Sequence, residues 1–179
     1  MSTLIFIHGP NGVGKSTVCN AIHHQLPHSA RLESEWCRMT NPFIWNDAII
    51  SLTMNNITQM LRGYLSCTWL RYVIFPYGFH GPRQQIWDAV LNNLRDIHYD
   101  FAPITLVCRE EEHITRMIRD GRDPARIQRA LAARYLYDAL PYPRIDTTHL
   151  TIDQTADRVI QVVRELREQS SVESRAGDS

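Results

Sequence analysis

The chain alternates between short apolar runs and longer segments in which apolar residues recur every three or four positions. Runs of the first kind are typical of strands. They cover residues 3–7, 30–33, 70–75, 104–108 and 144–147. Segments of the second kind are typical of amphipathic helices. Their apolar stripes begin at Val18, Ile50, Ile86, Ile127 and Ala156. This alternation predicts a three-layer α/β/α fold, with about five parallel strands between two layers of helices.

Local signals place the starts of two helices and the end of the domain. Asp123 and the proline after it suit the cap and the first position of a helix. Thr151 and Gln154 have the spacing of a capping box at the start of the last helix. From residue 169 onward the side chains are mostly small and polar. We therefore expect one domain over residues 1–168 and a disordered tail over residues 169–179.

The most informative stretch is GPNGVGKST, which lies between the first predicted strand and the first predicted helix. It fits the pattern G-x-x-x-x-G-K-[ST], in which backbone N–H groups surround phosphates, the lysine reaches the terminal phosphates and the hydroxyl holds Mg²⁺. The helix that follows points its free N–H groups at the anion. We expect a nucleoside triphosphate to bind through Gly9, Asn11, Gly12, Val13, Gly14, Lys15, Ser16 and Thr17.

Two kinds of residue in this phosphate loop have separate roles. Gly12 and Gly14 allow positive φ and let the backbone approach phosphate oxygens. Lys15 is the only lysine of the chain, since all other Lys and Arg positions hold arginine. A compact ammonium fits beneath a phosphate chain where a planar guanidinium fits less well. The position of this single lysine favours a polyphosphate ligand.

The overall composition bears on compartment and partners. The 19 basic and 19 acidic residues balance, so no bulk charge draws the chain to nucleic acid or to an anionic membrane. No segment approaches the roughly 18 apolar residues of a membrane span. The four cysteines form no C-x-x-C pair, which is typical of reduced packing residues. We expect a cytoplasmic monomer or homodimer.

Six arginines follow the fourth predicted strand. They are Arg116, Arg119, Arg122, Arg126, Arg129 and Arg134. Phosphoryl transfer spreads negative charge over the transferring group, so a kinase needs mobile cations that close over it and exclude water. A flexible stretch, DGRDP, separates the two arginine-bearing helices. We expect residues 116–134 to form a helical lid, although single arginines also fit a solvated helix face with acidic neighbours.

The phosphate loop and the stretch RMIRDGRD resemble those of the small P-loop kinases, the group of nucleoside monophosphate, shikimate and gluconate kinases. Within this group the chain is most similar to the chloramphenicol phosphotransferase and tunicamycin-resistance type. The resemblance implies that Arg116 or Arg119 flanks the adenine. It also implies that Arg119, Arg122 or Arg126 contacts phosphates.

The same resemblance assigns roles near other strand ends. The stretch IDTTHLT resembles the segment whose backbone borders the base, here Asp146 and Thr147. A carboxylate after the second strand commonly holds the acceptor hydroxyl, as a base or through Mg²⁺, and Glu33 or Glu35 matches that place. Many members carry an aspartate after the third strand for the Mg²⁺ shell, and this chain lacks it. The metal is therefore expected on Ser16, water and one glutamate, taken here as Glu35.

Aromatic and polar residues gather in two segments expected to border the acceptor. Trp36 lies beyond the second predicted strand, and Tyr77, His80 and Arg83 lie beyond the third. Together with Trp45, the aromatic side chains indicate an apolar pocket with a few polar anchors, or else parts of the core. Arg83 is suited either to anchor an anionic acceptor or to lie on the surface. The aromatic residues favour a hydrophobic acceptor, and the missing aspartate after the third predicted strand disfavours a nucleotide acceptor.

These features predict an ATP- and Mg²⁺-dependent kinase that phosphorylates a hydroxyl of a small molecule, such as an antibiotic. Lys15 is expected to neutralise the β and γ phosphates, Glu33 or Glu35 to orient the acceptor, and Arg119 and Arg122 to close over the transferring group. The rival predictions are a nucleoside or nucleotide kinase, a nucleotide-binding switch or ATPase, and a kinase of polynucleotide ends. ATP and GTP remain alternatives, although the N-K-x-D stretch of switch GTPases is absent.

Overall fold

The computed structural model describes the backbone of residues 1–177 and the side chains of residues 1–169. A five-stranded sheet forms its centre, with strand order β2-β3-β1-β4-β5 and parallel pairing between all neighbours. The strands are β1 Thr3–His8, β2 Ser29–Arg31, β3 Tyr72–Tyr77, β4 Asp100–Val107 and β5 Arg144–Asp146. The predicted α/β fold with five parallel strands is confirmed.

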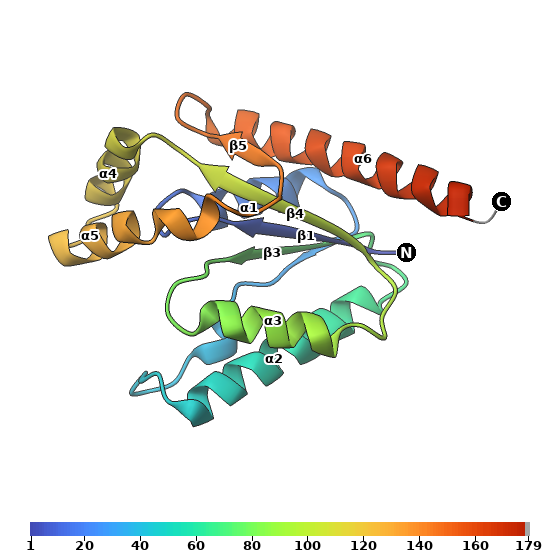
Figure 1. The fold of residues 1–179 in the computed structure, drawn as a ribbon, viewed down its shortest axis with the longest axis horizontal. Coiled ribbons are helices and arrows are strands. Elements are labelled where there is room, and N and C mark those ends of the chain that lie inside the picture. Colours follow the sequence, from blue (N-terminus) through green and yellow to red (C-terminus); the bar gives the residue numbers. More distant parts are fainter. Residues whose placement is uncertain (178–179) are drawn as a thin grey trace.

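Helices cover both faces of the sheet, and a further pair projects past the carboxyl ends of the strands (Figure 1). Helices α1 and α6 lie on one face, and α2 and α3 lie on the other. The projecting pair is α4 and α5. The bounds are α1 Lys15–Gln25, α2 Asp47–Leu65, α3 Arg83–Asn93, α4 Glu110–Arg119, α5 Pro124–Ala132 and α6 Ile152–Gly177. Two short 3-10 helices are η1 Trp36–Arg38 and η2 Arg134–Tyr137.

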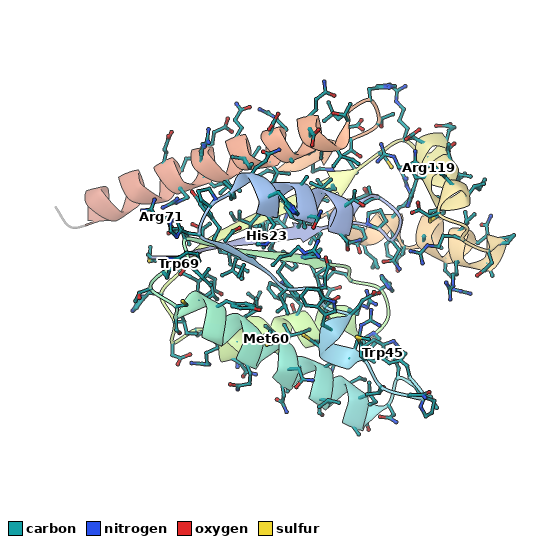
Figure 2. The ribbon with its side chains drawn as sticks, turned by 180° about the vertical axis from the view of Figure 1, so that it is seen from behind. His23, Trp45, Met60, Trp69, Arg71 and Arg119 are labelled. Atoms are coloured by element: carbon teal, nitrogen blue, oxygen red, sulfur yellow. The ribbon has the colours of Figure 1, made fainter. Side chains whose placement is uncertain are left out.

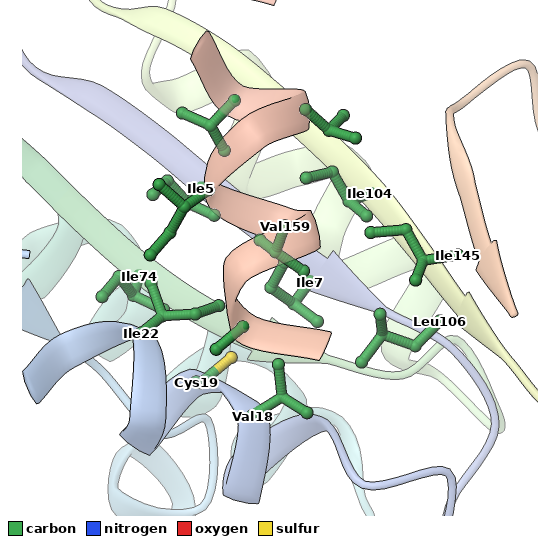
Figure 3. Packing of buried hydrophobic residues seen from close by; sticks show 14 of the residues in the cluster. Ile5, Ile7, Val18, Cys19, Ile22, Ile74, Ile104, Leu106, Ile145 and Val159 are labelled. Carbon is green, nitrogen blue, oxygen red and sulfur yellow. The ribbon is translucent and has the colours of Figure 1, made fainter. Parts of the chain in front are cut away.

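Two apolar cores hold the layers together, because successive side chains of a strand point to opposite faces. Ile5 and Ile7 of β1 pack with α1 and α6, and Figure 3 shows them beside Val159 of α6. Phe6, the residue between them, faces α3, where its ring stacks on Trp87 with centroids 4.1 Å apart. Burial on both faces fixes the carboxyl ends of the strands and therefore the loops that follow them.

The two predicted helix starts are confirmed. A carboxylate oxygen of Asp123 accepts a hydrogen bond of 2.9 Å from the backbone N–H of Arg126. Thr151 N donates to Gln154 Oε1 at 2.9 Å, and Gln154 N donates to Thr151 Oγ1 at 3.2 Å. These bonds satisfy N–H groups that a helix start leaves without intrahelical partners.

Two predicted boundaries differ from the structure. Strand β3 extends through Tyr77, which pairs with His8, so Tyr77 belongs to the strand and not to the turn after it. Helix α6 continues to Gly177 and therefore covers most of the segment expected to be a disordered tail. No proline or glycine interrupts residues 169–176, so a helix nucleated by packing further upstream can extend through them. Residues 178 and 179 lie outside the described residues.

None of the helices that the structure describes is both long enough and apolar enough to cross a lipid bilayer.

Candidate active site

The loop between β1 and α1 turns tightly because its glycines have left-handed φ values. These values are 149° for Gly9, 86° for Gly12 and 103° for Gly14, which confirms the positive φ predicted for the last two. A Cβ atom at Gly9 would lie 2.5 Å from the carbonyl oxygen of Leu106, so only glycine lets the loop pass this close to β4. Gly14 directly precedes α1, whose first-turn N–H groups are available to an anion at the loop.

The ammonium of Lys15 turns back onto the phosphate loop. Its Nζ donates to the carbonyl oxygens of Gly9 at 2.8 Å and Pro10 at 2.9 Å. Burial and the positive charge of Arg83 lower the pKa of Lys15 to about 7, although nearby acidic groups act in the opposite direction. No carboxylate lies within ion-pair distance of this ammonium in the described part of the chain. An anionic ligand would therefore restore the stabilisation that Lys15 has lost on burial.

Ser16 and Glu33 form a pair of oxygen ligands beside Lys15. Ser16 Oγ donates to Glu33 Oε2 at 3.1 Å. The other carboxylate oxygen, Oε1, is buried, lies 3.7 Å from Nη1 of Arg31 and has no hydrogen-bond partner among the described residues. Burial raises the pKa of Glu33, and the bond from Ser16 and the charge of Arg31 offset part of this rise. Because Mg²⁺ prefers oxygen ligands, this pair fits a magnesium ion.

Glu35 lies on the same cavity but has a different partner. Its side chain is 79% exposed, and it forms an ion pair of 3.2 Å with Arg38. The side chain hydrogen-bonded to Ser16 is thus Glu33, whereas the sequence indicated Glu35 as the metal ligand. The described residues contain no cluster of three or more His, Cys, Asp or Glu side chains that could hold a metal without further ligands.

A polar cavity of about 250 Å³, here called the phosphate cavity, opens above the loop. The carboxyl ends of parallel strands meet at this edge of the sheet, so residues far apart in the sequence share its walls. They are Asn11, Gly12, Gly14, Lys15, Ser16, Thr17, Glu33, Ser34, Glu35, Pro76, Tyr77, Gly78, Arg83, Asp120 and Arg122. Arg122 of the predicted lid is therefore brought to Lys15 and Ser16. The carboxyl end of β3 contributes Tyr77 and no carboxylate.

A second cavity of about 380 Å³, here called the base cavity, lies between the phosphate loop, α4 and the start of α6. Arg116 spans one wall, since its guanidinium donates to Thr147 Oγ1 at 2.9 Å, to Thr147 O at 2.7 Å and to Val13 O at 3.3 Å. Arg119 also lines this cavity and does not line the phosphate cavity. Asp146 lines neither, because its Oδ1 accepts from the backbone N–H and the hydroxyl of Thr148.

A third cavity of about 690 Å³, here called the acceptor cavity, lies between the β3–α3 loop and the α4–α5 pair. Its walls are Asn11, Gly12, Glu35, Arg38, Trp45, His80, Gly81, Arg83, Met117, Arg122, Arg126, Arg129, Ala130 and Ala133. In Figure 2, Trp45 lies at the same end of the molecule as Arg119, opposite Trp69 and Arg71. Among the residues predicted to bind the substrate, His80 and Arg83 both line this cavity.

Two of the aromatic residues predicted to contact the substrate, Trp36 and Tyr77, do not line the acceptor cavity. Trp36 is 53% exposed and lines none of the three cavities, because η1 turns it toward Arg31, whose guanidinium lies 5.9 Å from the ring. Tyr77 is buried, lines the phosphate cavity and donates its hydroxyl to the carbonyl oxygen of Arg83 at 3.1 Å. Trp45 lines the acceptor cavity instead.

Two histidines fix the tip of the phosphate loop at Asn11. Asn11 Nδ2 lies 3.0 Å from Nε2 of His80 and donates to it. The buried His113 donates from Nε2 to the backbone carbonyl of Asn11 at 2.6 Å, and its Nδ1 accepts from Arg134 at 3.2 Å. The role of His113 was not predicted, because 102 residues separate it from Asn11 and no local pattern links them.

Comparisons with known proteins agree on the fold. No family model and no curated protein sequence matches the chain. Among solved structures, the tunicamycin resistance protein of Deinococcus radiodurans is 22% identical, with a TM-score of 0.67 over 91% of this chain and 96% of that one. A gluconokinase from Sinorhizobium meliloti is 15% identical, with a TM-score of 0.67 over 97% of both chains. A shikimate kinase from Acinetobacter baumannii is 18% identical, with a TM-score of 0.62 over 92% of this chain and 94% of that one. The chain therefore has the fold of the small P-loop kinases.

Proposed function

We propose that the protein is an ATP- and Mg²⁺-dependent kinase that transfers a phosphoryl group to a hydroxyl of a small molecule. One observation supports this most strongly. The phosphate cavity shares Gly14 and Thr17 with the base cavity, and Arg83 and Arg122 with the larger acceptor cavity, so it lies between them. Two ligands that meet at a phosphate loop favour group transfer over hydrolysis alone, because both reactants can be held in contact.

Each part of the site has a role in this proposal. Lys15 and the backbone N–H groups of the loop bind the phosphates, and Arg122 adds charge from the α4–α5 pair. Ser16 and Glu33 hold magnesium, which when bound neutralises charge on the transferring group. Arg116, which contacts Thr147, borders the base. Water is kept out when the α4–α5 pair moves toward the loop.

The same three cavities argue against two of the rivals. A nucleotide switch or simple ATPase needs no acceptor cavity of about 690 Å³ beside its phosphate loop. A kinase of polynucleotide ends needs an extended basic surface that follows a phosphate backbone, whereas the arginines here gather around a single cavity beside the phosphate loop. A nucleoside kinase remains within the proposal, since its acceptor is also a small hydroxyl compound, whereas a nucleotide kinase would transfer the phosphoryl group to a phosphate instead.

Mass spectrometry of acceptors tests the proposal directly. The protein is incubated with Mg-ATP or Mg-GTP and with hydroxyl compounds suggested by the names of the similar structures, namely gluconate, shikimate and the antibiotic tunicamycin. The proposal expects an acceptor that gains one phosphate in step with the ADP or GDP formed. Nucleotide hydrolysis whose rate no acceptor changes would instead support the switch or ATPase.

A further inference from the structure

The acceptor cavity concentrates positive charge in a molecule whose total charge is balanced. One carboxylate, Glu35, and five arginines line it. The arginines are Arg38, Arg83, Arg122, Arg126 and Arg129. The whole chain has equal numbers of basic and acidic residues, so this excess is local. Guanidinium groups brought together repel each other, and Arg38 and Arg83 are also partly buried, so a neutral ligand would offset neither cost.

Three of the five arginines are left without an anionic partner. Arg38 pairs with Glu35 at 3.2 Å, and Arg126 pairs with Asp123 at 3.3 Å. Within residues 1–169, no side-chain hydrogen bond and no ion pair engages the guanidinium groups of Arg83, Arg122 and Arg129. Arg122 also lines the phosphate cavity, where the transferring group is expected. Arg83 and Arg129 thus remain available for the acceptor.

Arg83 is the most informative of these residues because it is half-buried at the junction of two cavities. Burial and repulsion by Arg38 lower its pKa. A partly buried charge without a hydrogen-bonded partner is costly in the free protein. The neighbouring His80 does not supply an anion, and burial and the charge of Arg83 lower its pKa to about 4, so it stays neutral near pH 7.

We propose that the acceptor is a small anionic alcohol, which carries a carboxylate or a phosphate monoester besides the hydroxyl that is phosphorylated. The inference rests on the proposed kinase function and narrows its substrate class. Arg83 and Arg129 bind the anionic group through charge-assisted hydrogen bonds, and Trp45 supplies apolar surface for the carbon skeleton. This replaces the predominantly apolar acceptor expected from the aromatic residues.

The transfer step balances without a further reactant. The acceptor oxygen bonds to the γ phosphorus, while the bond from that phosphorus to the β–γ bridging oxygen breaks and its electron pair leaves with ADP. The proton of the acceptor hydroxyl passes to a carboxylate or to water. Glu35, which lines both the phosphate cavity and the acceptor cavity, is the carboxylate placed to receive it, since Glu33 is assigned to magnesium.

Matched pairs of acceptors test this inference, because the members of each pair differ chiefly in charge. The pairs are gluconate with glucose and glycerol 3-phosphate with glycerol. For each pair, kcat/KM is measured by ADP release, and the ratio of the anionic to the neutral member is calculated. We expect a ratio above about 100 for at least one pair, since several charge-assisted hydrogen bonds add to binding. The pair that shows it distinguishes a carboxylate from a phosphate.

Variants of Arg83 link that ratio to the cavity. Arg83→Gln is expected to lower the ratio about 10- to 100-fold, and Arg83→Lys is expected to retain part of it, because the charge remains but the planar fork is lost. Because both kcat/KM values in the ratio come from the same variant, a general loss of active protein lowers them equally and leaves the ratio unchanged. The matched control is Arg95→Ala, because Arg95 is exposed just after α3 and lines none of the three cavities.

Three results would overturn the inference. The first is a ratio near one for every pair, and the second is a high ratio that Arg83→Gln leaves unchanged. The third is an absence of turnover in all pairs, combined with equal or no thermal shifts from anionic and neutral members in the presence of Mg²⁺ and a non-hydrolysable ATP analogue. Equal turnover of charged and neutral alcohols would leave the kinase proposal intact, whereas failure to bind nucleotide would remove both.

Discussion

Glu33 and Glu35 lie two residues apart but have different partners. Glu33 accepts from Ser16 at 3.1 Å and keeps a buried oxygen that no described residue bonds, whereas Glu35 is exposed and paired with Arg38. An oxygen that is desolvated and lacks a donor is suited to receive a cation. At the residue scale, the metal site of the proposed kinase therefore rests on Glu33.

Replacing each glutamate by glutamine separates the two roles. We expect Glu33→Gln to raise the Mg²⁺ concentration needed for half-maximal activity about 10- to 100-fold, the loss typical of altered metal-site carboxylates. Glu35→Gln is the matched control and should change this concentration less than about threefold. Initial rates measured across a Mg²⁺ titration at saturating ATP give both values. A larger effect of Glu35→Gln than of Glu33→Gln would instead identify Glu35 as the metal ligand, as the sequence indicated.

The phosphate loop is the element whose conformation depends most on glycine. Gly9 has φ of 149° and faces the carbonyl oxygen of Leu106, so an added Cβ atom cannot be accommodated without moving β1 or β4. Gly63 is exposed in the last turn of α2, and a Cβ atom added there would have no neighbour within 4 Å. Substituting the two glycines therefore tests whether the phosphate loop requires glycine at position 9 for its backbone conformation.

We expect Gly9→Ala to lower the free energy of unfolding by about 2 kcal/mol or more, because both a close contact and a left-handed φ oppose a side chain. Gly63→Ala should raise it by up to about 0.5 kcal/mol, because alanine favours a helix over glycine and Gly63 lies in the last turn of α2. Urea denaturation followed by circular dichroism measures both changes. Equal, small effects of the two substitutions would show that the loop tolerates a side chain at Gly9.

The elements of this chain differ in how far their sequence predicts their position. The phosphate loop was predicted in detail because all its determinants lie within nine consecutive residues. The position of the Trp36 side chain was not predicted, because η1, which begins at Trp36, sets its direction after β2 has ended. The contact of His113 with Asn11 and the charge of the acceptor cavity depend on how the α4–α5 pair lies beyond the carboxyl ends of the strands, which periodicity does not specify.

At the scale of the whole molecule, His8, the residue just before the phosphate loop, makes the free energy of unfolding depend on pH. His8 is fully buried at the end of β1, where its Nε2 lies 3.1 Å from Thr105 Oγ1 and its Nδ1 has no partner among the described residues. Burial, followed by the charges of Lys15 and Arg144, lowers its pKa to about 3. Between that value and the ordinary pKa of about 6.5, the unfolded chain binds a proton that the folded chain does not.

The fold should therefore lose stability as the pH falls below about 6.5. For His8 the slope is at most about 1.4 kcal/mol per pH unit, since one proton is taken up on unfolding. His8→Gln, which removes this titration while keeping a polar side chain near Thr105, should flatten the dependence even if its stability at pH 7 is lower. Urea denaturation at pH 7, 6, 5 and 4.5 measures the slopes. An identical slope in the variant and the parent protein would exclude His8 as a source.

The central claim is that Lys15 and the surrounding loop exist to bind the phosphates of a nucleoside triphosphate. Isothermal titration calorimetry of the folded protein with ATP and Mg²⁺ tests it most directly. The account predicts saturable binding at one site, and at least about tenfold weaker binding by Lys15→Ala with an unchanged circular dichroism spectrum, because the charge-assisted hydrogen bond from the ammonium to the phosphates is lost. Equal binding by both proteins, or no binding of ATP or GTP by either, would contradict it.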